Sequence, residues 1–236
     1  MHRGKRAFIL GNGPSLREAP LHLLGDEINF SMNNISDIFP HTEWRPQYYF
    51  NTTIQVFRFR DWMEKAQLAI KASHVAFIRR DSPMARAPNV CELNVGGYAC
   101  KSCHNPLPKF SHDCAKQVSN YRMSMWGISQ LVLYMGIKKI YFLGCDLGWK
   151  PSDMKEGVDP NHLSENYGGA FYWTKYLAAR ENFYQLEGHR LLKNIFEENG
   201  VEAYNATVGG DLDVYPRADI HEVLSVPESR DVFGEA

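Results

Sequence analysis

A glycine-rich segment near the N-terminus, Gly11-Asn12-Gly13-Pro14-Ser15, has the residue types that bind a phosphate group. The apolar run before it predicts a strand, and the Pro-Ser pair is typical of a helix start. N–H groups at a helix start lack helical partners and carry partial positive charge, while glycines allow the main chain to approach a ligand closely. The segment matches neither the P-loop nor the G-x-G-x-x-G pattern. We expect a nucleotide site here, and a capped strand-to-helix turn is the alternative.

Two further residues could act on a bound substrate. His162 lies in Asp159-Pro160-Asn161-His162, and a histidine titrates near neutral pH, so it could serve as a general base. The alternative is an exposed loop histidine. Asp146 comes directly after an apolar run, where it could bind a ribose hydroxyl, a pterin-like ring or Mg²⁺, or cap a turn.

Four cysteines within a short stretch form a second distinctive feature. Cys91, Cys100, Cys103 and Cys114 include a Cys-x-x-Cys spacing, which is typical of zinc ligands. Few apolar residues are present to pack this stretch, so a structural zinc ion is the favoured interpretation. Disulfides and free thiols are the alternatives.

The elements that must position these residues are indicated by hydrophobic periodicity. Apolar runs predict strands at 7–10, 28–31, 47–51, 75–78, 139–143 and 201–204, and helical patterns occur at 123–135 and 183–196. Alternating strands and helices predict an α/β fold, with a Rossmann-like, mostly parallel sheet and helices on both faces. Because such sheets bind ligands at the carboxyl ends of their strands, we expect Gly11, Asn51 and Asp146 to lie close together.

Two segments interrupt this alternation within what we expect to be a single domain spanning residues 1–236. Residues 82–116 are rich in Pro, Gly, Cys and His and are expected to form an insertion. Residues 148–175 mix Pro, Asp, Gly, Asn and aromatic residues and are expected to form a lid over the site.

Composition excludes several functional classes. The 236 residues include 26 basic and 27 acidic side chains, so no basic excess indicates binding to nucleic acid. No apolar run is long enough to span a membrane, and no signal peptide is visible, so a cytoplasmic location is expected. The aromatic content of 13% suits a protein with pockets lined by rings.

Several local patterns, taken in order, resemble one superfamily. They are the glycine-rich segment at 11–15, Met32-Asn33-Asn34, Phe50-Asn51, Ser124 on its helix, the run ending in Cys145-Asp146, and Asn161-His162. The chain resembles the bacterial sialyltransferases that use cytidine-monophosphate-activated sialic acid, and the related motility-accessory-factor glycosyltransferases. It also resembles the 6-hydroxymethylpterin diphosphokinase-like (MptE-like) proteins of archaea, and the segments 205–210 and 214–217 look more like this branch.

The resemblance implies roles for individual residues in binding a nucleotide donor. Asn12 and Ser15 would hold the phosphate and ribose region, together with the backbone of the glycine-rich segment. Asn33 and Asn51 would contact the nucleotide and its sugar, and Ser124 would bind the donor from the start of its helix.

The resemblance also implies a catalytic set. His162 matches the general base of the superfamily, and Tyr167 and Tyr172 could donate hydrogen bonds to the leaving phosphate. The sialyltransferase pattern places such tyrosines before the histidine, whereas here Trp149 is the sole aromatic residue between Asp146 and His162.

These observations favour an inverting, metal-independent glycosyltransferase that moves a sugar from a nucleotide to a glycan or small-molecule acceptor. No cofactor is expected for the transfer, although the cysteines could hold a structural zinc ion. The alternative is a diphosphokinase-like transferase that depends on ATP and Mg²⁺, in which Asp146 and Asp159 would matter more than His162. A nucleotide-binding protein without catalysis is the third reading.

Overall fold

The computed structural model describes residues 2–53, 60–96, 109–121, 123–147 and 175–226. Its main element is a seven-stranded sheet with the order β5-β4-β3-β2-β1-β8-β9, in which all neighbouring strands are parallel. The strands are β1 (Arg6–Leu10), β2 (Asn29–Met32), β3 (Tyr48–Asn51), β4 (Val75–Arg79), β5 (Val90–Leu93), β8 (Lys139–Leu143) and β9 (Glu202–Asn205). All strands expected from the apolar runs are present, and β5 is an additional edge strand.

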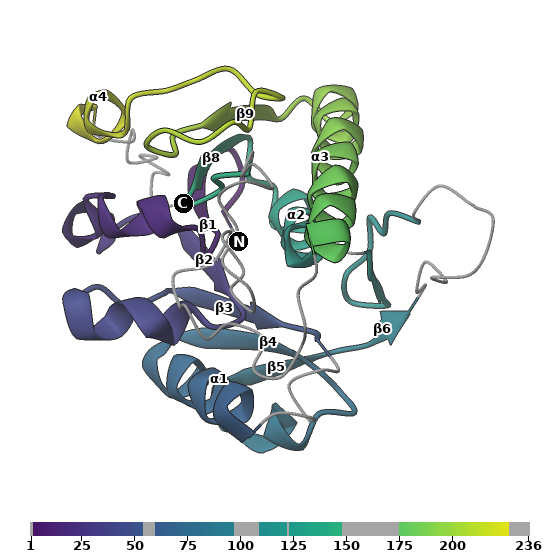
Figure 1. Cartoon of the computed structure of the whole chain (residues 1–236). Coiled ribbons are helices and arrows are strands. Elements are labelled where there is room, and N and C mark those ends of the chain that lie inside the picture. The colour runs from purple at the N-terminus through teal and green to yellow at the C-terminus, as the bar shows by residue number, and fades with distance from the viewer. Residues whose placement is uncertain (1, 54–59, 97–108, 122, 148–174, 227–236) are drawn as a thin grey trace, which may run out of the picture.

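Helices cover both faces of this sheet (Figure 1). One face carries α1 (Arg60–Ala72), α4 (Ile220–Ser225) and four 3-10 helices, namely η1 (Pro14–Arg17), η2 (Leu21–Leu24), η3 (Ile35–His41) and η5 (Pro83–Arg86). The other face carries α2 (Ser124–Tyr134) and α3 (Lys175–Glu198). This arrangement confirms the expected Rossmann-like α/β fold.

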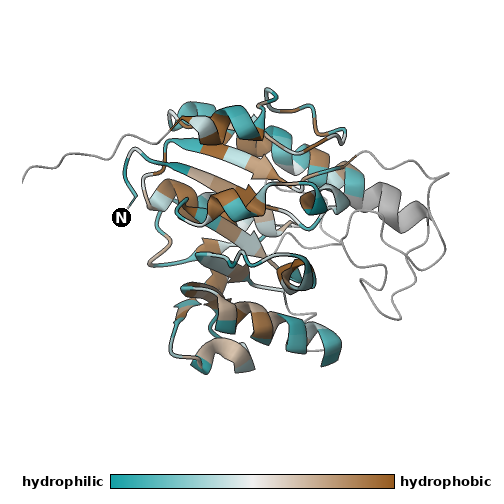
Figure 2. Ribbon diagram, turned by 90° about the vertical axis from the view of Figure 1, so that its left-hand side faces the viewer, coloured by the Kyte–Doolittle hydropathy of each residue, from teal (hydrophilic) through white to brown (hydrophobic). Residues whose placement is uncertain are grey.

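The inner strands are mostly apolar because both of their faces are buried. Successive side chains of a strand point to opposite faces, so Ala7 and Ile9 join the core under α2 and α3. Phe8 and Leu10 join the core under α1 and the 3-10 helices. Figure 2 shows the same division, with largely hydrophobic strands behind helices of mixed hydropathy. Burial on both faces explains why these strands appear as continuous apolar runs.

The helix α2 is buried on nearly all sides because it lies between the sheet and α3. Gly127 lets it approach β3, since a Cβ added there would lie 2.2 Å from Cζ of Phe50. Gly188 of α3 allows a similar approach, because its Cβ would lie 2.4 Å from Sδ of Met123. The predicted helix at 123–135 is confirmed, and Gly136, with a φ of +80°, follows its end.

The helix expected at Pro14 is reduced to a single turn. The segment η1 is a four-residue 3-10 helix, and Pro20, which lacks an N–H group, prevents a longer helix from continuing through this position. A helix therefore starts at Pro14 as expected, but it is a single 3-10 turn.

The segment 82–116 contributes in part to the main sheet. Its residues Val90–Leu93 form β5 and pair with β4. Two shorter strands, β6 (Val95–Gly96) and β7 (Val118–Ser119), form a separate parallel pair. Residues 97–108 lie outside the described residues, as does most of the expected lid at 148–175.

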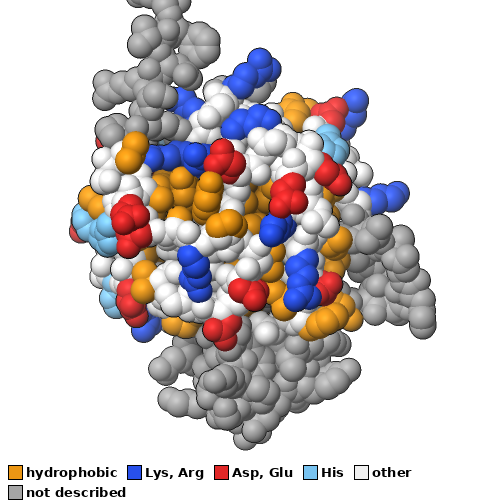
Figure 3. All heavy atoms as spheres, turned by 90° about the horizontal axis from the view of Figure 1, so that it is seen from above, with side chains coloured by type: hydrophobic (Ala, Val, Ile, Leu, Met, Phe, Trp, Pro, Cys, Tyr) orange, Lys and Arg blue, Asp and Glu red, His pale blue; other side chains and the backbone are white. Residues whose placement is uncertain are grey.

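The surface seen from the β9 side of the molecule carries charged side chains of both signs. Figure 3 shows Lys and Arg interspersed with Asp and Glu around a central group of apolar side chains. Within the described ranges, no helix is both long and apolar enough to cross a membrane.

Candidate functional site

The sheet reverses its strand order between β1 and β8. From β1 the chain builds β2 to β5 on one side, whereas β8 and β9 lie on the other side (Figure 1). Parallel α/β sheets bind ligands in the crevice at the carboxyl ends of the two strands beside such a point. Gly11–Ser15 follows β1 and Asp146 follows β8, so the topology brings these predicted site residues together.

Asp146 is bound directly to the glycine-rich segment. Its Oδ2 accepts a hydrogen bond from Oγ of Ser15 at 2.9 Å, and its Oδ1 accepts one from the Ser15 backbone N–H at 3.2 Å. The Asp146 carboxylate therefore accepts the hydrogen bond of the Ser15 N–H group, which was expected to bind a phosphate.

The two glycines are required by close packing between the loops that follow β1 and β8. The N–H groups of Gly11 and Gly13 donate to the carbonyl oxygens of Leu143 and Gly144, at 2.8 and 2.9 Å. A Cβ on Gly13 would lie 1.7 Å from Oδ2 of Asp146. Gly13 has a φ of −69°, so the lack of a side chain, rather than a left-handed backbone, explains glycine at this position.

The environment of Asp146 disfavours its ionised form. Partial burial raises the pKa of Asp146 above the ordinary value of an aspartate, and the two Ser15 hydrogen bonds act in the opposite direction. The segment after β9 covers it further, because the N–H of Asp211 donates to the Asp146 carbonyl oxygen at 2.8 Å. Arg217 stabilises that segment by donating to the carbonyl oxygens of Thr207 and Gly209, at 2.8 and 2.6 Å.

Three other predicted residues belong to one hydrogen-bond network. Oγ of Ser124, in the first turn of α2, donates to Oδ1 of Asn33 at 3.1 Å. Tyr49 donates through its hydroxyl group to the Asn33 carbonyl oxygen at 2.7 Å and accepts from Nδ2 of Asn51 at 2.9 Å. The structure therefore links Asn33, Asn51 and Ser124 at the carboxyl ends of β2 and β3.

Asn12 carries a polar atom that lacks a partner. Its side chain is buried, with 7% exposed, and Nδ2 donates to the Met32 carbonyl oxygen at 3.1 Å. That bond fixes the amide orientation, and Oδ1 has no hydrogen-bond partner among the described residues. Nδ2 of Asn34 and Oγ of Ser36, after β2, are likewise buried and unpartnered in the described part of the chain.

Sequence reasoning missed the part that Tyr49 plays. It lies inside an apolar run and its side chain is fully buried, so its type and position predicted only a core residue. Its contact with Asn33 depends on the pairing of β2 with β3, which the sequence does not specify.

The catalytic residues expected in the lid, His162, Tyr167 and Tyr172, lie outside the described residues. The same is true of two of the four cysteines, Cys100 and Cys103.

The other two cysteines are described. Cys91 is exposed on β5, and Cys114 is buried in the core under α2. No group of three or more His, Cys, Asp or Glu side chains that could hold a metal ion occurs in the ranges that the structure describes. The zinc site therefore stays a prediction.

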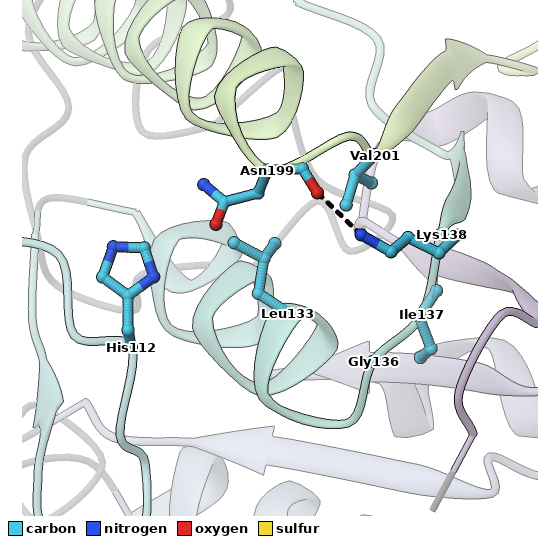
Figure 4. Close-up of a pocket in the computed structure, with 7 residues that line it drawn as sticks. All are labelled: His112, Leu133, Gly136, Ile137, Lys138, Asn199 and Val201. Carbon is cyan, nitrogen blue, oxygen red and sulfur yellow. Dashed lines mark hydrogen bonds between the residues drawn. The ribbon is translucent and has the colours of Figure 1, made fainter.

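A cavity of about 100 Å³ lies at the end of the sheet opposite to the candidate site (Figure 4). His112, Leu133, Lys138 and Asn199 are among its lining residues, and Nζ of Lys138 donates to the Asn199 carbonyl oxygen at 2.7 Å. These residues come before β8 and β9 in the chain, so the cavity lies at the amino ends of the strands, away from Asp146.

Comparison with known proteins shows a similarity at the level of structure. No protein-family model matches the chain, and no curated protein matches it. Among solved structures, a MAf glycosyltransferase from Magnetospirillum magneticum AMB-1 is similar, with a TM-score of 0.54 and 14% identity. The match covers 93% of this chain and 34% of that chain. The chain therefore shares its Rossmann-like α/β fold with a part of this glycosyltransferase.

Proposed function

We propose that the chain is a glycosyltransferase that transfers a sugar, such as a nonulosonic acid, from a nucleotide-activated donor. The observation that carries the binding step is the buried Oδ1 of Asn12, which has no partner among the described residues. A buried acceptor without a partner costs about 1–3 kcal/mol. A hydroxyl or amino group of a bound nucleotide sugar would supply the missing donor.

The charges around the site suggest how the ligand lies. Because Ser15 already binds the Asp146 carboxylate, a phosphate placed there would be repelled by it. We infer that the phosphate lies instead at the start of α2, beside Ser124 and Asn33, where helical N–H groups favour an anion. Asp146 and Oδ1 of Asn12 are both acceptors and suit the hydroxyl groups of the ribose or the sugar.

Transfer would proceed with inversion. His162 would accept the proton of the acceptor hydroxyl group as that oxygen attacks the anomeric carbon and the nucleotide phosphate departs. Tyr167 and Tyr172 would donate hydrogen bonds to the departing phosphate, so the step would need no bound metal ion.

Binding is tested with a panel of cytidine, uridine, guanosine and adenosine nucleotides, each with and without Mg²⁺, measured by thermal shift and calorimetry. Asn12→Ala should weaken the tightest ligand about tenfold, since a ligand hydrogen bond is lost. Asn29→Ala is the matched control, because Asn29 is also a buried asparagine but both ends of its amide are bonded within the protein. It should lower stability and leave affinity unchanged. Failure of the wild-type protein to bind any nucleotide would refute the proposal.

Catalysis is tested with His162→Ala. Loss of a general base should lower turnover by about 10²–10⁴-fold while nucleotide affinity stays nearly unchanged, and activity should survive a chelator. A requirement for ATP and Mg²⁺, together with an active His162→Ala variant, would instead establish the diphosphokinase alternative.

A further inference from the structure

The hydroxyl group of Tyr49 forms hydrogen bonds with both Asn33 and Asn51. Its oxygen donates to the carbonyl oxygen of Asn33 at 2.7 Å and accepts from Nδ2 of Asn51 at 2.9 Å. The ring belongs to the core on the α1 face of the sheet. The tyrosine therefore reaches from the core to the carboxyl ends of β2 and β3.

Asn33 has an unusual backbone conformation. Its φ is +50°, in the left-handed region that residues other than glycine seldom adopt, although asparagine tolerates it best. Its N–H donates to the Phe50 carbonyl oxygen at 3.3 Å, and its own carbonyl oxygen is held by Tyr49. Both bonds join the Asn33 backbone to residues of β3 and hold it in this conformation.

The side chain of Asn33 points to the other layer of the molecule. Oδ1 accepts the hydrogen bond from Oγ of Ser124 on α2 at 3.1 Å, which leaves Nδ2 to donate to a ligand. Asn33 follows the carboxyl end of β2. Its backbone is bonded to Tyr49 on one side of the sheet, and its side-chain amide is bonded to Ser124 at the start of α2 on the other.

The side-chain amide of Asn51 is bonded to Tyr49 and to the backbone of Thr53. Its side chain is 2% exposed, and Oδ1 accepts from the Thr53 backbone N–H at 3.0 Å while Nδ2 donates to Tyr49. The amide is therefore engaged at both ends within the protein.

We propose that Tyr49 is a positioning residue for the nucleotide site. Its hydroxyl group, oriented by Asn51, holds Asn33 in the left-handed conformation, and Nδ2 of Asn33 is thereby presented to an acceptor group of the ligand beside α2. This inference rests on the proposed nucleotide-binding function. It reassigns Asn51 from a ligand contact to a support of Tyr49.

The test compares Tyr49→Phe with Tyr141→Phe. Both substitutions remove one phenolic hydroxyl group from the same core cluster and keep the ring. Tyr141 lies on β8, where it stacks between Phe8 and Tyr204, and it takes no part in the bonds that hold Asn33.

The first measurement needs no ligand. In a crystal structure of free Tyr49→Phe, Asn33 should leave the left-handed region and lose its bond to Ser124, whereas Tyr141→Phe should keep both. Asn33 retained at a φ near its wild-type value in Tyr49→Phe would overturn the proposal.

The second measurement is nucleotide affinity by calorimetry, with the four nucleoside 5′-diphosphates and cytidine 5′-monophosphate as probes. Tyr49→Phe should raise the Kd of the tightest probe about tenfold, the scale of one hydrogen bond, and Tyr141→Phe should not. Equal affinities in both variants would reject the positioning role while the nucleotide site stands. Absence of binding to the wild-type protein would refute the proposed function, and the crystal structures would still decide the role of Tyr49.

If Tyr49→Phe does not fold, Asn51→Ala replaces it. Removal of the Asn51 amide takes away one hydrogen-bond partner of the Tyr49 hydroxyl group, so the Kd of the tightest nucleotide probe should rise about threefold. An unchanged Kd in this variant would count against the proposal in the same way.

Discussion

At the scale of the residue, Asp146 is the acidic group at the point where the sheet reverses its strand order. Its carboxylate holds Ser15, and its partial burial makes the ionised form costly. A half-buried aspartate whose pKa is shifted by burial is typical of a binding site, where hydroxyl groups of a ligand would offset the lost hydration of the carboxylate.

The variant Asp146→Asn tests this view through pH. Because the pKa of Asp146 is raised on folding, the carboxyl group contributes stability at pH values below its unfolded pKa, and that contribution is lost as pH rises through the folded pKa. We expect the stability of Asp146→Asn relative to wild type to increase from pH 4 to pH 8, while nucleotide affinity falls. Thermal unfolding across this range measures the trend, and a decrease with rising pH would contradict it.

At the scale of the element, the helix α2 places Ser124 by lying very close to β3. The approach depends on Gly127, where any side chain would meet the ring of Phe50. Because Ser124 lies one turn before Gly127 on the same helix, a displacement of α2 would also lengthen the bond between Ser124 and Asn33.

Gly127→Ala should therefore affect both stability and binding. Overpacking a core contact costs about 1–3 kcal/mol, and the displaced serine should weaken nucleotide affinity. Gly25→Ala is the control, since Gly25 has a helical backbone, with φ −58° and ψ −40°, and no atom within 4 Å of an added Cβ. Chemical denaturation measures the difference, and equal stability of the two variants would show that α2 tolerates the added methyl group.

At the scale of the whole molecule, α3 is joined to the sheet and to the segment after β9 through a buried histidine. His189 lies against Phe142 of β8, and its Nδ1 is 3.1 Å from the hydroxyl oxygen of Tyr215. That hydroxyl group also donates to the His189 carbonyl oxygen at 3.1 Å. Burial lowers the pKa of His189 to about 3.

The stability of the whole chain should therefore depend on pH below neutrality. Since unfolded histidine gains a proton below about pH 6.5 and buried His189 does not, the free energy of unfolding should fall by up to about 1.4 kcal/mol per pH unit between pH 6.5 and pH 3. His189→Gln removes this titration and should show a shallower decline. Urea unfolding at pH 7 and pH 5 compares the two proteins, and parallel curves would exclude the contribution of His189.

The sequence by itself predicted six of the seven strands of the main sheet, the helices α2 and α3 and the α/β class, whereas α1 was not predicted. Parallel strands buried on both faces are mostly apolar, and glycines follow α2 and α3 where each helix ends, so these features are local and visible in residue order. The order of motifs also indicated that Asn33, Asn51 and Ser124 belong to one site.

Only the tertiary structure decided how these residues are arranged. The bond between Asp146 and Ser15 spans 131 positions and that between Ser124 and Asn33 spans 91, so both depend on strand order rather than on local pattern. The same holds for the pairing of β5 within a segment whose composition indicated an insertion. The left-handed Asn33 and the role of Tyr49 arise from contacts between β2 and β3, because a backbone conformation that is locally unfavourable persists only where surrounding bonds enforce it.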